Sequence, residues 1–142
     1  MFQDIKQRIT EPEVGKIISY ASFDGSPEGI AKKAEKYLSS DSLNFYGWVE
    51  GGEVIGVCGF EIHDDKVEIQ LISVAEDRQR QGIGGAMVRE LQEIYYLPIE
   101  AETDDDAVDF YRKSGFITTV FQHPKKGKRH ACVLEVKKQC KA

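Results

Sequence analysis

The order of its segments predicts an α+β fold for this chain of 142 residues. Two helix-like segments come first, three strand-like segments joined by short turns follow, and helices then alternate with strands to the end. Strands joined by tight turns pair side by side in a sheet, and amphipathic helices cover the faces of that sheet. A chain of this length forms one domain with a sizeable core. We therefore expect a single α+β domain over residues 1–142.

The first forty residues predict two helices. Residues 11–21 have helical spacing, with Thr10 as the expected N-cap and Pro12 in the first turn. Ser26 and Pro27 start a second helix in the same way. The apolar faces of these helices consist of Val14, Ile17 and Ile18 in the first and of Ile30, Ala31, Ala34 and Leu38 in the second.

Three strands should follow as a meander. Residues 44–50, 54–63 and 67–75 are rich in residues that favour strands. Glycines at 51–52 and aspartates at 64–65 are typical of the turns between them. Because consecutive strands of this kind pair antiparallel, we expect these three to form the centre of the sheet.

The second half alternates helices and strands. A strand is expected at 98–102, a helix starting at Asp105, a strand at 116–122, a basic loop at 124–129 and a last strand at 130–137. A longer helix precedes them, and its apolar stripe consists of Ile83, Met87, Leu91, Ile94 and Tyr95.

A glycine-rich loop joins the third strand to that longer helix. Residues 79–86 read Gln-Arg-Gln-Gly-Ile-Gly-Gly-Ala. The N-terminus of a helix has unpaired N–H groups and a partial positive charge, and glycines let a phosphate approach them closely. The loop therefore predicts a pyrophosphate site, with a plain surface turn as the alternative.

Two common phosphate-binding motifs do not fit this loop. A Walker loop needs a Lys followed by Ser or Thr after the last glycine, and none follows here. A dinucleotide-binding fingerprint needs a third glycine or alanine where this chain has Met87. The first glycine of that fingerprint also follows its strand directly, whereas the polar residues 76–81 separate strand and glycine here.

The remaining match is Gln/Arg-x-x-Gly-x-Gly/Ala, which resembles the signature of the GNAT superfamily of acetyl-CoA-dependent N-acetyltransferases. Residues 104–116, Asp-Asp-Asp-Ala-Val-Asp-Phe-Tyr-Arg-Lys-Ser-Gly-Phe, look like the C-terminal segment of that family, Asn-x-x-Ala-x-x-Phe-Tyr-x-x-x-Gly-Phe. The order and spacing of the two segments are also typical of the family. The resemblance covers roughly residues 43–137 and implies a mixed, mostly antiparallel sheet that splays open at the cofactor.

The resemblance implies acetyl-CoA as co-substrate. In the family the loop amides hold the pyrophosphate, free amides on the preceding, bulged strand bind the pantetheine arm and the acetyl carbonyl, and a tyrosine faces the sulfur. The cofactor-binding residues implied here are Ile72, Ser73, Val74, Gln79, Arg80, Gln81, Gly82, Ile83, Gly84, Gly85, Asp104 and Tyr111. Asp104 departs from the usual Asn, and capping of the following helix is the simpler role for its carboxylate.

Two side chains carry the expected chemistry. Acyl transfer needs a base, because an alkylammonium of pKa about 10.4 has no free lone pair, and a proton donor for the leaving thiolate. Glu68, eleven residues before Gln79, matches the general base of the histone-acetylating members, and Tyr111 matches the tyrosine that faces the sulfur. Many small bacterial relatives have an acid where this chain has Gln70, and Glu61 could assist through water. The simpler alternatives are a solvated Glu68 and a purely structural Tyr111.

Regular alternation would place Glu68, Gln70, Ile72 and Val74 on one face of their strand. The cysteines Cys58, Cys132 and Cys140 show no paired spacing, which favours a reducing cytoplasm and gives a cysteine nucleophile little support. The histidines His63, His123 and His130 form no metal pattern, so no metal is expected.

The whole-chain properties narrow the function. A formal net charge of −5 argues against nucleic acid as a partner, and neither a membrane span nor a signal peptide is evident. The sequence thus predicts a cytoplasmic N-acetyltransferase, monomer or homodimer, that acts on an amine of a small molecule or protein by direct attack in a ternary complex. The alternative is a non-catalytic module that binds acyl-CoA.

Overall fold

The computed structural model describes residues 1–22 and 24–136. The helices are α1 (Pro12–Ser19), α2 (Pro27–Ser39), α3 (Ile83–Tyr95) and α4 (Val108–Lys113), with short 3-10 turns η1 (Lys6–Arg8) and η2 (Glu76–Arg78). The strands are β1 (Phe2–Asp4), β2 (Leu43–Glu50), β3 (Glu53–Ile62), β4 (Val67–Val74), β5 (Ile99–Thr103), β6 (Ile117–His123) and β7 (Gly127–Leu134).

The strands form one mixed sheet in the order β1-β2-β3-β4-β5-β7-β6. Every neighbouring pair is antiparallel except β4 and β5, which are parallel. The α3 crossover between those two strands is the helical connection that a parallel pair requires. The predicted α+β fold with a mixed, mostly antiparallel sheet is confirmed.

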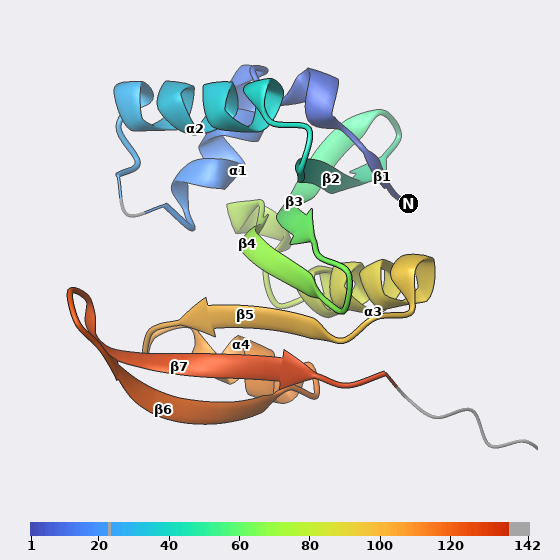
Figure 1. Ribbon diagram of the computed structural model, residues 1–142. Helices are drawn as coiled ribbons and strands as arrows, with labels where there is room; N and C mark the ends of the chain where they lie inside the picture. Colours follow the sequence, from blue (N-terminus) through green and yellow to red (C-terminus); the bar gives the residue numbers. More distant parts are fainter. Residues whose placement is uncertain (23, 137–142) are drawn as a thin grey trace, which may run out of the picture.

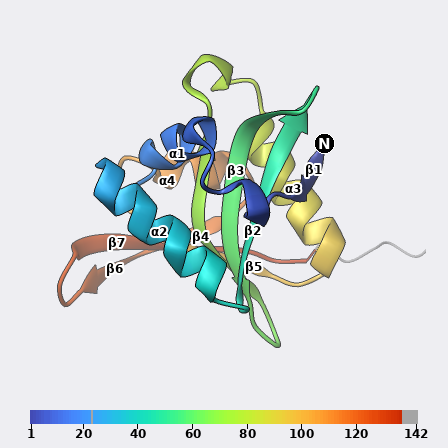
Figure 2. The same cartoon turned by 90° about the horizontal axis from the view of Figure 1, so that it is seen from above.

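Helices cover both faces of the sheet. Figure 2 shows α1 and α2 in front of the strands and α3 and α4 behind them. The α1–α2 side buries a cluster that includes Val14, Ile18, Phe45 and Leu71. The α3–α4 side buries a second cluster that includes Met87, Leu91, Val108, Tyr111 and Phe116. Burial of each large side chain contributes about 1.5–3 kcal/mol, so both layers stabilise the same sheet.

The two N-terminal helices begin close to the predicted positions, but only α2 has the predicted N-cap. Ser26 caps α2, because its Oγ accepts a hydrogen bond from the Gly29 N–H at 3.1 Å. Thr10 does not cap α1: the residue before the helix is Glu11, and its side chain makes no capping hydrogen bond. Pro12 at the first position lacks an N–H and already fixes the helical φ, so a side-chain cap is less needed there.

The predicted buried face of α2 is partly wrong. Ala34 is buried, but Ala31 is exposed and Leu38 is 44% exposed, while Tyr37 is buried instead. Tyr37 packs edge-to-face on Phe45 of β2, with ring centroids 5.5 Å apart. The helix is therefore rotated so that its aromatic residue, rather than its leucine, fills the core.

Several element boundaries also differ from the prediction. The helix expected from Asp105 starts at Val108, and Ile94 of α3 is 46% exposed. The last strand begins three residues early, at Gly127, because the β6–β7 turn is tight. Its predicted end at Lys137 and the residue Cys140 lie outside the described residues. Within residues 1–22 and 24–136, no helix is long and apolar enough to cross a membrane.

Candidate active site

The sheet splits between β4 and β5. These strands pair only at Val67 with Ile99 and at Glu68 with Glu100, whereas β4 remains paired with β3 through Val74. Figure 1 shows β4 and β5 close together at one end and diverging toward the other. From Ile69 onward, the side of β4 that faces β5 is therefore a free edge, and its backbone groups are available to a ligand.

A β-bulge at Gln70 lies where the split begins. In the pairing with β3, Phe60 is opposite Ile69 and Gly59 is opposite Leu71, so Gln70 is an extra residue without a partner. A bulge of this kind breaks the alternation of side chains. The expected bulged strand is present, with its bulge two residues before Ile72.

The bulge overturns the predicted common face of β4. Ile69 and Ile72 both belong to the cluster on the α3–α4 side, whereas Leu71 belongs to the cluster on the α1–α2 side. Val67 lies in the α3–α4 cluster, so its neighbour Glu68 faces the α1–α2 side. Glu68 and Ile72 consequently lie on opposite faces, because the strand is not regular.

The glycine loop leads from β4 through η2 into α3. Arg80 and Gly82 both have left-handed backbone conformations, with φ of 67° and 81°. The first intrahelical bond runs from the Ala86 N–H to the Gly82 carbonyl, which leaves the N–H groups of 83–85 without helical partners. Such a loop at a helix N-terminus gathers N–H groups into a concavity suited to an anion.

The glycines of the loop serve different purposes. A Cβ built on Gly82 would meet nothing within 4 Å, so this residue is required for its positive φ and faces open space. A Cβ on Gly84 would lie 2.7 Å from the Phe110 ring, so this glycine is required by the packing of α3 on α4. Gly82 thus leaves room for a ligand, whereas Gly84 allows α3 to pack closely against α4.

The arginines near the loop are not equivalent. The Arg78 guanidinium donates to Glu50 at 2.9 Å and to the Gln81 side chain at 2.9 Å. Arg80 forms no ion pair with any described residue. Arg89, which the sequence reasoning missed, folds back along α3, so that its Nη1 lies 3.4 Å from where a Cβ of Gly85 would stand. Its position four residues after Gly85 could have indicated this, because residues i and i+4 share one helix face.

The remaining loop prediction concerns Gln79. Its Nε2 donates to the carbonyl of Val74 at 3.1 Å and so ties the loop to the end of β4. This bond fixes the loop beside the free edge of the strand.

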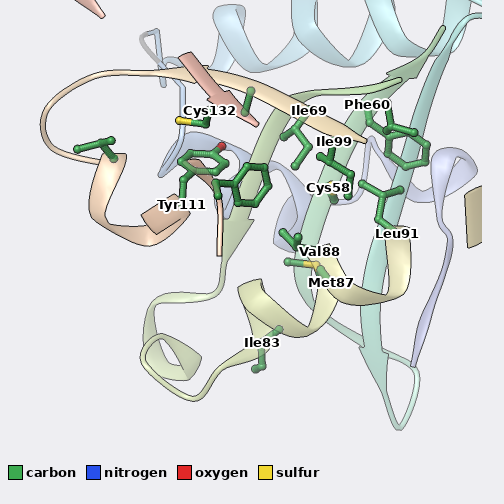
Figure 3. Close-up of a cluster of buried hydrophobic side chains, with 14 of the residues drawn as sticks. Cys58, Phe60, Ile69, Ile83, Met87, Val88, Leu91, Ile99, Tyr111 and Cys132 are labelled. Atoms are coloured by element: carbon green, nitrogen blue, oxygen red, sulfur yellow. The ribbon is translucent and has the colours of Figure 1, made fainter. Parts of the chain in front are cut away.

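Tyr111 is a core residue that also carries a hydroxyl group. It is 6% exposed and packs edge-to-face on Phe110 and Phe116, with ring centroids 5.0 and 5.2 Å away. Figure 3 shows its ring next to Cys132 on the α3–α4 side of the sheet. Its hydroxyl forms no hydrogen bond with any described side chain. Burial raises the pKa of Tyr111 well above its ordinary value, so the phenol keeps its proton at neutral pH and can donate it.

The described cysteines are poor nucleophiles. Cys58 is fully buried, and burial raises the pKa of its thiol to about 12. Burial also raises the pKa of Cys132. Because the thiolate is the reactive form, neither thiol is suited to form a covalent acyl-enzyme.

Glu68 lies within a small polar cluster at the β3–β4 hairpin. It is the cross-strand partner of Glu61, and its Oε1 lies 3.1 Å from Nε2 of His63. The same Nε2 lies 3.4 Å from Oε1 of Glu61. The histidines show no metal pattern in the sequence, because the hairpin brings His63 to Glu68 only in three dimensions.

Asp104 caps a turn rather than the helix itself. Its Oδ1 accepts hydrogen bonds from the N–H groups of Asp106 and Ala107, both at 3.0 Å. The next residue, Asp105, is held by Nε2 of the buried His130 at 2.6 Å and by Lys128 at 3.2 Å. These contacts fix the turn that leads into α4, and thereby Tyr111.

Acidic neighbours pair with three of the four basic side chains of the loop at 124–129. Nζ of Lys126 and Nε of Arg129 lie 3.7 and 3.2 Å from Oε2 of Glu102, and Lys128 pairs with Asp105. A hollow of about 890 Å³ lies elsewhere, between residues 9–11, α1 and α2, and no residue of the glycine loop lines it.

Comparison with known proteins now decides the family. Residues 11–116 match the Acetyltransferase (GNAT) family, which is well over half of the chain. The chain belongs to the GNAT acetyltransferase family. Membership supports acetyl-CoA-dependent transfer of an acetyl group to an amine in general terms.

Individual GNAT proteins resemble this chain over much of its length. The uncharacterized N-acetyltransferase in the lysA 3′ region of Bacillus methanolicus is 28% identical over 80 residues, which is 56% of this chain and 67% of that protein. An aminoglycoside 6′-N-acetyltransferase complexed with coenzyme A superimposes with a TM-score of 0.75 at 14% identity, covering 99% of both chains. The ribosomal-protein-S18-alanine N-acetyltransferase from Escherichia coli gives a TM-score of 0.70 at 17% identity, covering 98% of this chain and 95% of that one. At these identities the structural likeness shows the GNAT fold.

Proposed function

We propose that this protein is an N-acetyltransferase that moves an acetyl group from acetyl-CoA to a primary amine by direct attack in a ternary complex. The observation that carries this proposal is the split between β4 and β5, which begins beside Glu68 and runs toward the glycine loop. The split leaves a free strand edge on β4, and that strand leads through η2 into the glycine loop.

The residues fit the cofactor. Unpaired N–H groups of 83–85, the open space at Gly82 and the unpaired Arg80 suit the pyrophosphate of coenzyme A. The free edge at 72–74 suits the amides of the pantetheine arm. When bound, acetyl-CoA supplies a thioester whose carbonyl can be attacked.

Each residue then has a task in the transfer. Glu68 takes a proton from the ammonium group of the acceptor, either directly or through water, so that the nitrogen gains a free lone pair. A backbone N–H in the 72–74 segment stabilises the negative charge that develops on the carbonyl oxygen as the C–N bond forms. The C–S bond breaks, and the hydroxyl of Tyr111 donates its proton to the departing sulfur. The attacking nitrogen loses its second proton as the amide forms, and this proton restores the Tyr111 hydroxyl through water.

The two catalytic side chains lie on opposite faces of the sheet. Glu68 faces the α1–α2 side, and Tyr111 lies in the cluster on the α3–α4 side. Two substrates can therefore approach the split from opposite faces and meet within it. This arrangement suits direct transfer, and the raised pKa of the Cys58 thiol disfavours a covalent route.

We place the acceptor on the α1–α2 side. Glu68 faces that side, and its cross-strand partner Glu61 accepts a hydrogen bond from Ser42, just after the end of α2. The two solved relatives differ in acceptor, one being named for an aminoglycoside and the other for a ribosomal protein, so the proposal extends to a primary amine of either class. The net charge of −5 suits a cationic acceptor.

The test begins with thermal unfolding of the purified protein in the presence of acetyl-CoA, CoA or NADH. A ligand at about 100 times its dissociation constant adds roughly 2.7 kcal/mol, so acetyl-CoA and CoA should both raise the melting temperature while NADH should not. Absence of any shift with both CoA species would contradict the cofactor site.

An amine screen then separates the enzyme from the alternative, a module that only binds acyl-CoA. Release of CoA from acetyl-CoA in the presence of an amine supports the enzyme. On an identified acceptor, Glu68→Gln should lower turnover and leave CoA binding unchanged. Binding without turnover across small amines, peptides and lysate would favour the binding module.

A further inference from the structure

We infer that Glu61, His63 and Glu68 form a binding site for a zinc ion at the β3–β4 hairpin. Three potential ligand atoms, one from each side chain, lie within 4.8 Å of one another. One imidazole nitrogen and two carboxylate oxygens are a donor set that Zn²⁺ accepts, whereas Mg²⁺ and Ca²⁺ prefer oxygen ligands alone.

The distances agree with a zinc site. Ligand atoms about 2.0–2.2 Å from a zinc ion at tetrahedral angles lie about 3.3–3.6 Å from each other. Nε2 of His63 lies 3.4 Å from Glu61 and 3.1 Å from Glu68. The side chains therefore need to move by only a few tenths of an ångström on these two edges to admit the ion.

The backbone holds the ligands in place. Glu61 and Glu68 are direct partners in the β3–β4 ladder, and the His63 N–H donates to the Lys66 carbonyl at 2.8 Å, which closes the turn. The second oxygen of Glu61 accepts a hydrogen bond from Ser42 Oγ at 2.9 Å. Such outer contacts orient a metal ligand and are a regular part of metal sites.

Charge and access also favour a divalent cation. Two carboxylates converge on one imidazole nitrogen, which can offer them a single proton, whereas a zinc ion would balance both negative charges. The three side chains are 29–43% exposed, so an ion can enter from solvent and water can complete its coordination. The nearest lysine, Lys66, has its ammonium group 3.2 Å from Glu100.

One consequence rests on the proposed function. Glu68 is the proposed base, so a zinc ion bound there would remove that base and inhibit acetyl transfer. The site would then let zinc regulate the enzyme through the acceptor side, without competition with acetyl-CoA.

The test is a zinc titration of the full-length protein with a chromogenic chelator as competitor, without acetyl-CoA or amine. We expect one zinc ion per chain and a loss of affinity of more than 10-fold in both His63→Asn and Glu61→Gln. Glu90→Gln, which removes an exposed carboxylate of α3, is the matched control and should bind zinc like the wild type. Circular dichroism of each variant checks that the hairpin still folds.

Equal zinc affinity in His63→Asn and Glu90→Gln, or no saturation at one ion per chain, would overturn the site. This readout does not depend on enzyme activity, so it stands apart from the thermal-shift test of the cofactor site. Once an acceptor is known, zinc should inhibit the wild type and spare His63→Asn. Zinc binding without inhibition would retain the site and contradict Glu68 as the base.

Discussion

At the scale of single residues, burial decides which groups can take part in the chemistry. Tyr111 and Cys58 both lie in the α3–α4 cluster, and burial raises the pKa of each. The same shift keeps the phenol protonated at neutral pH, as a proton donor must be, and keeps the thiol in its protonated, unreactive form. Glu68 is half-exposed instead, which agrees with its proposed role as a base that meets an acceptor from solvent.

Substitution Tyr111→Phe tests the proton donor directly. The ring and its packing on Phe110 and Phe116 remain, because only the hydroxyl is removed. We expect kcat to fall by about 100-fold or more, as is usual when a general acid is lost, with little change in the dissociation constant of acetyl-CoA. Steady-state kinetics and calorimetric titration measure the two quantities. An unchanged kcat would reduce Tyr111 to a structural residue.

At the scale of elements, the position of α4 depends on the turn before it. Asp105 is held by the buried His130 and by Lys128, and these hydrogen bonds lower the pKa of Asp105 below its ordinary value. A carboxyl group with a lowered pKa in the folded state stabilises that state above its unfolded pKa, and this contribution disappears as the pH falls through the folded value.

Asp105→Asn should therefore lower the melting temperature near neutral pH. The difference from the wild type should shrink below about pH 4, where the carboxylate of the unfolded chain is protonated and the folded one begins to follow. Asp106→Asn is the control, because that exposed side chain forms no ion pair with any described residue. Melting curves over a pH series measure the effect, and a pH-independent difference would show that the ion pair contributes nothing.

The same scale shows what the sequence could predict. Long periodic elements such as α3 and the β2–β4 meander were predicted correctly, because their apolar spacing is local information. The glycine loop and Tyr111 were proposed as site residues on the basis of motifs, and their roles stay predictions. The side chains on each face of β4 were predicted wrongly, because the bulge at Gln70 depends on the pairing of β4 with β3. Alternation along one strand does not reveal that pairing.

Contacts between distant segments were missed for the same reason. The His63–Glu68 contact needs the hairpin, and the His130–Asp105 contact joins residues 25 positions apart. The strand β1 has three residues, too few to show a period, and only its pairing with β2 defines it. Polar residues whose partners lie on another strand carry no local signal.

At the scale of the whole molecule, one split sheet supports two cores. Strands β3 and β4 contribute side chains to both clusters, for example Cys58 and Val67 to one and Val57 and Leu71 to the other. The two halves of the sheet meet directly at only two residue pairs between β4 and β5. Helix α3, whose Leu91 and Met87 are fully buried, therefore has a large part in holding the two halves of the sheet together.

This arrangement predicts that the chain unfolds as one unit. Leu91→Ala removes side-chain volume from the α3–α4 cluster and Ile18→Ala from the α1–α2 cluster, and each should lower the free energy of unfolding by about 2–5 kcal/mol. Ile94→Ala on the same helix as Leu91 is the control, because Ile94 is 46% exposed and its loss should cost about 0.5 kcal/mol or less. For each of the three variants, urea unfolding should give one transition that is the same by fluorescence and by circular dichroism. If Ile18→Ala instead separated an early transition of the α1–α2 layer from a later one, the two cores would be independent units, and the single domain expected over residues 1–142 would be wrong.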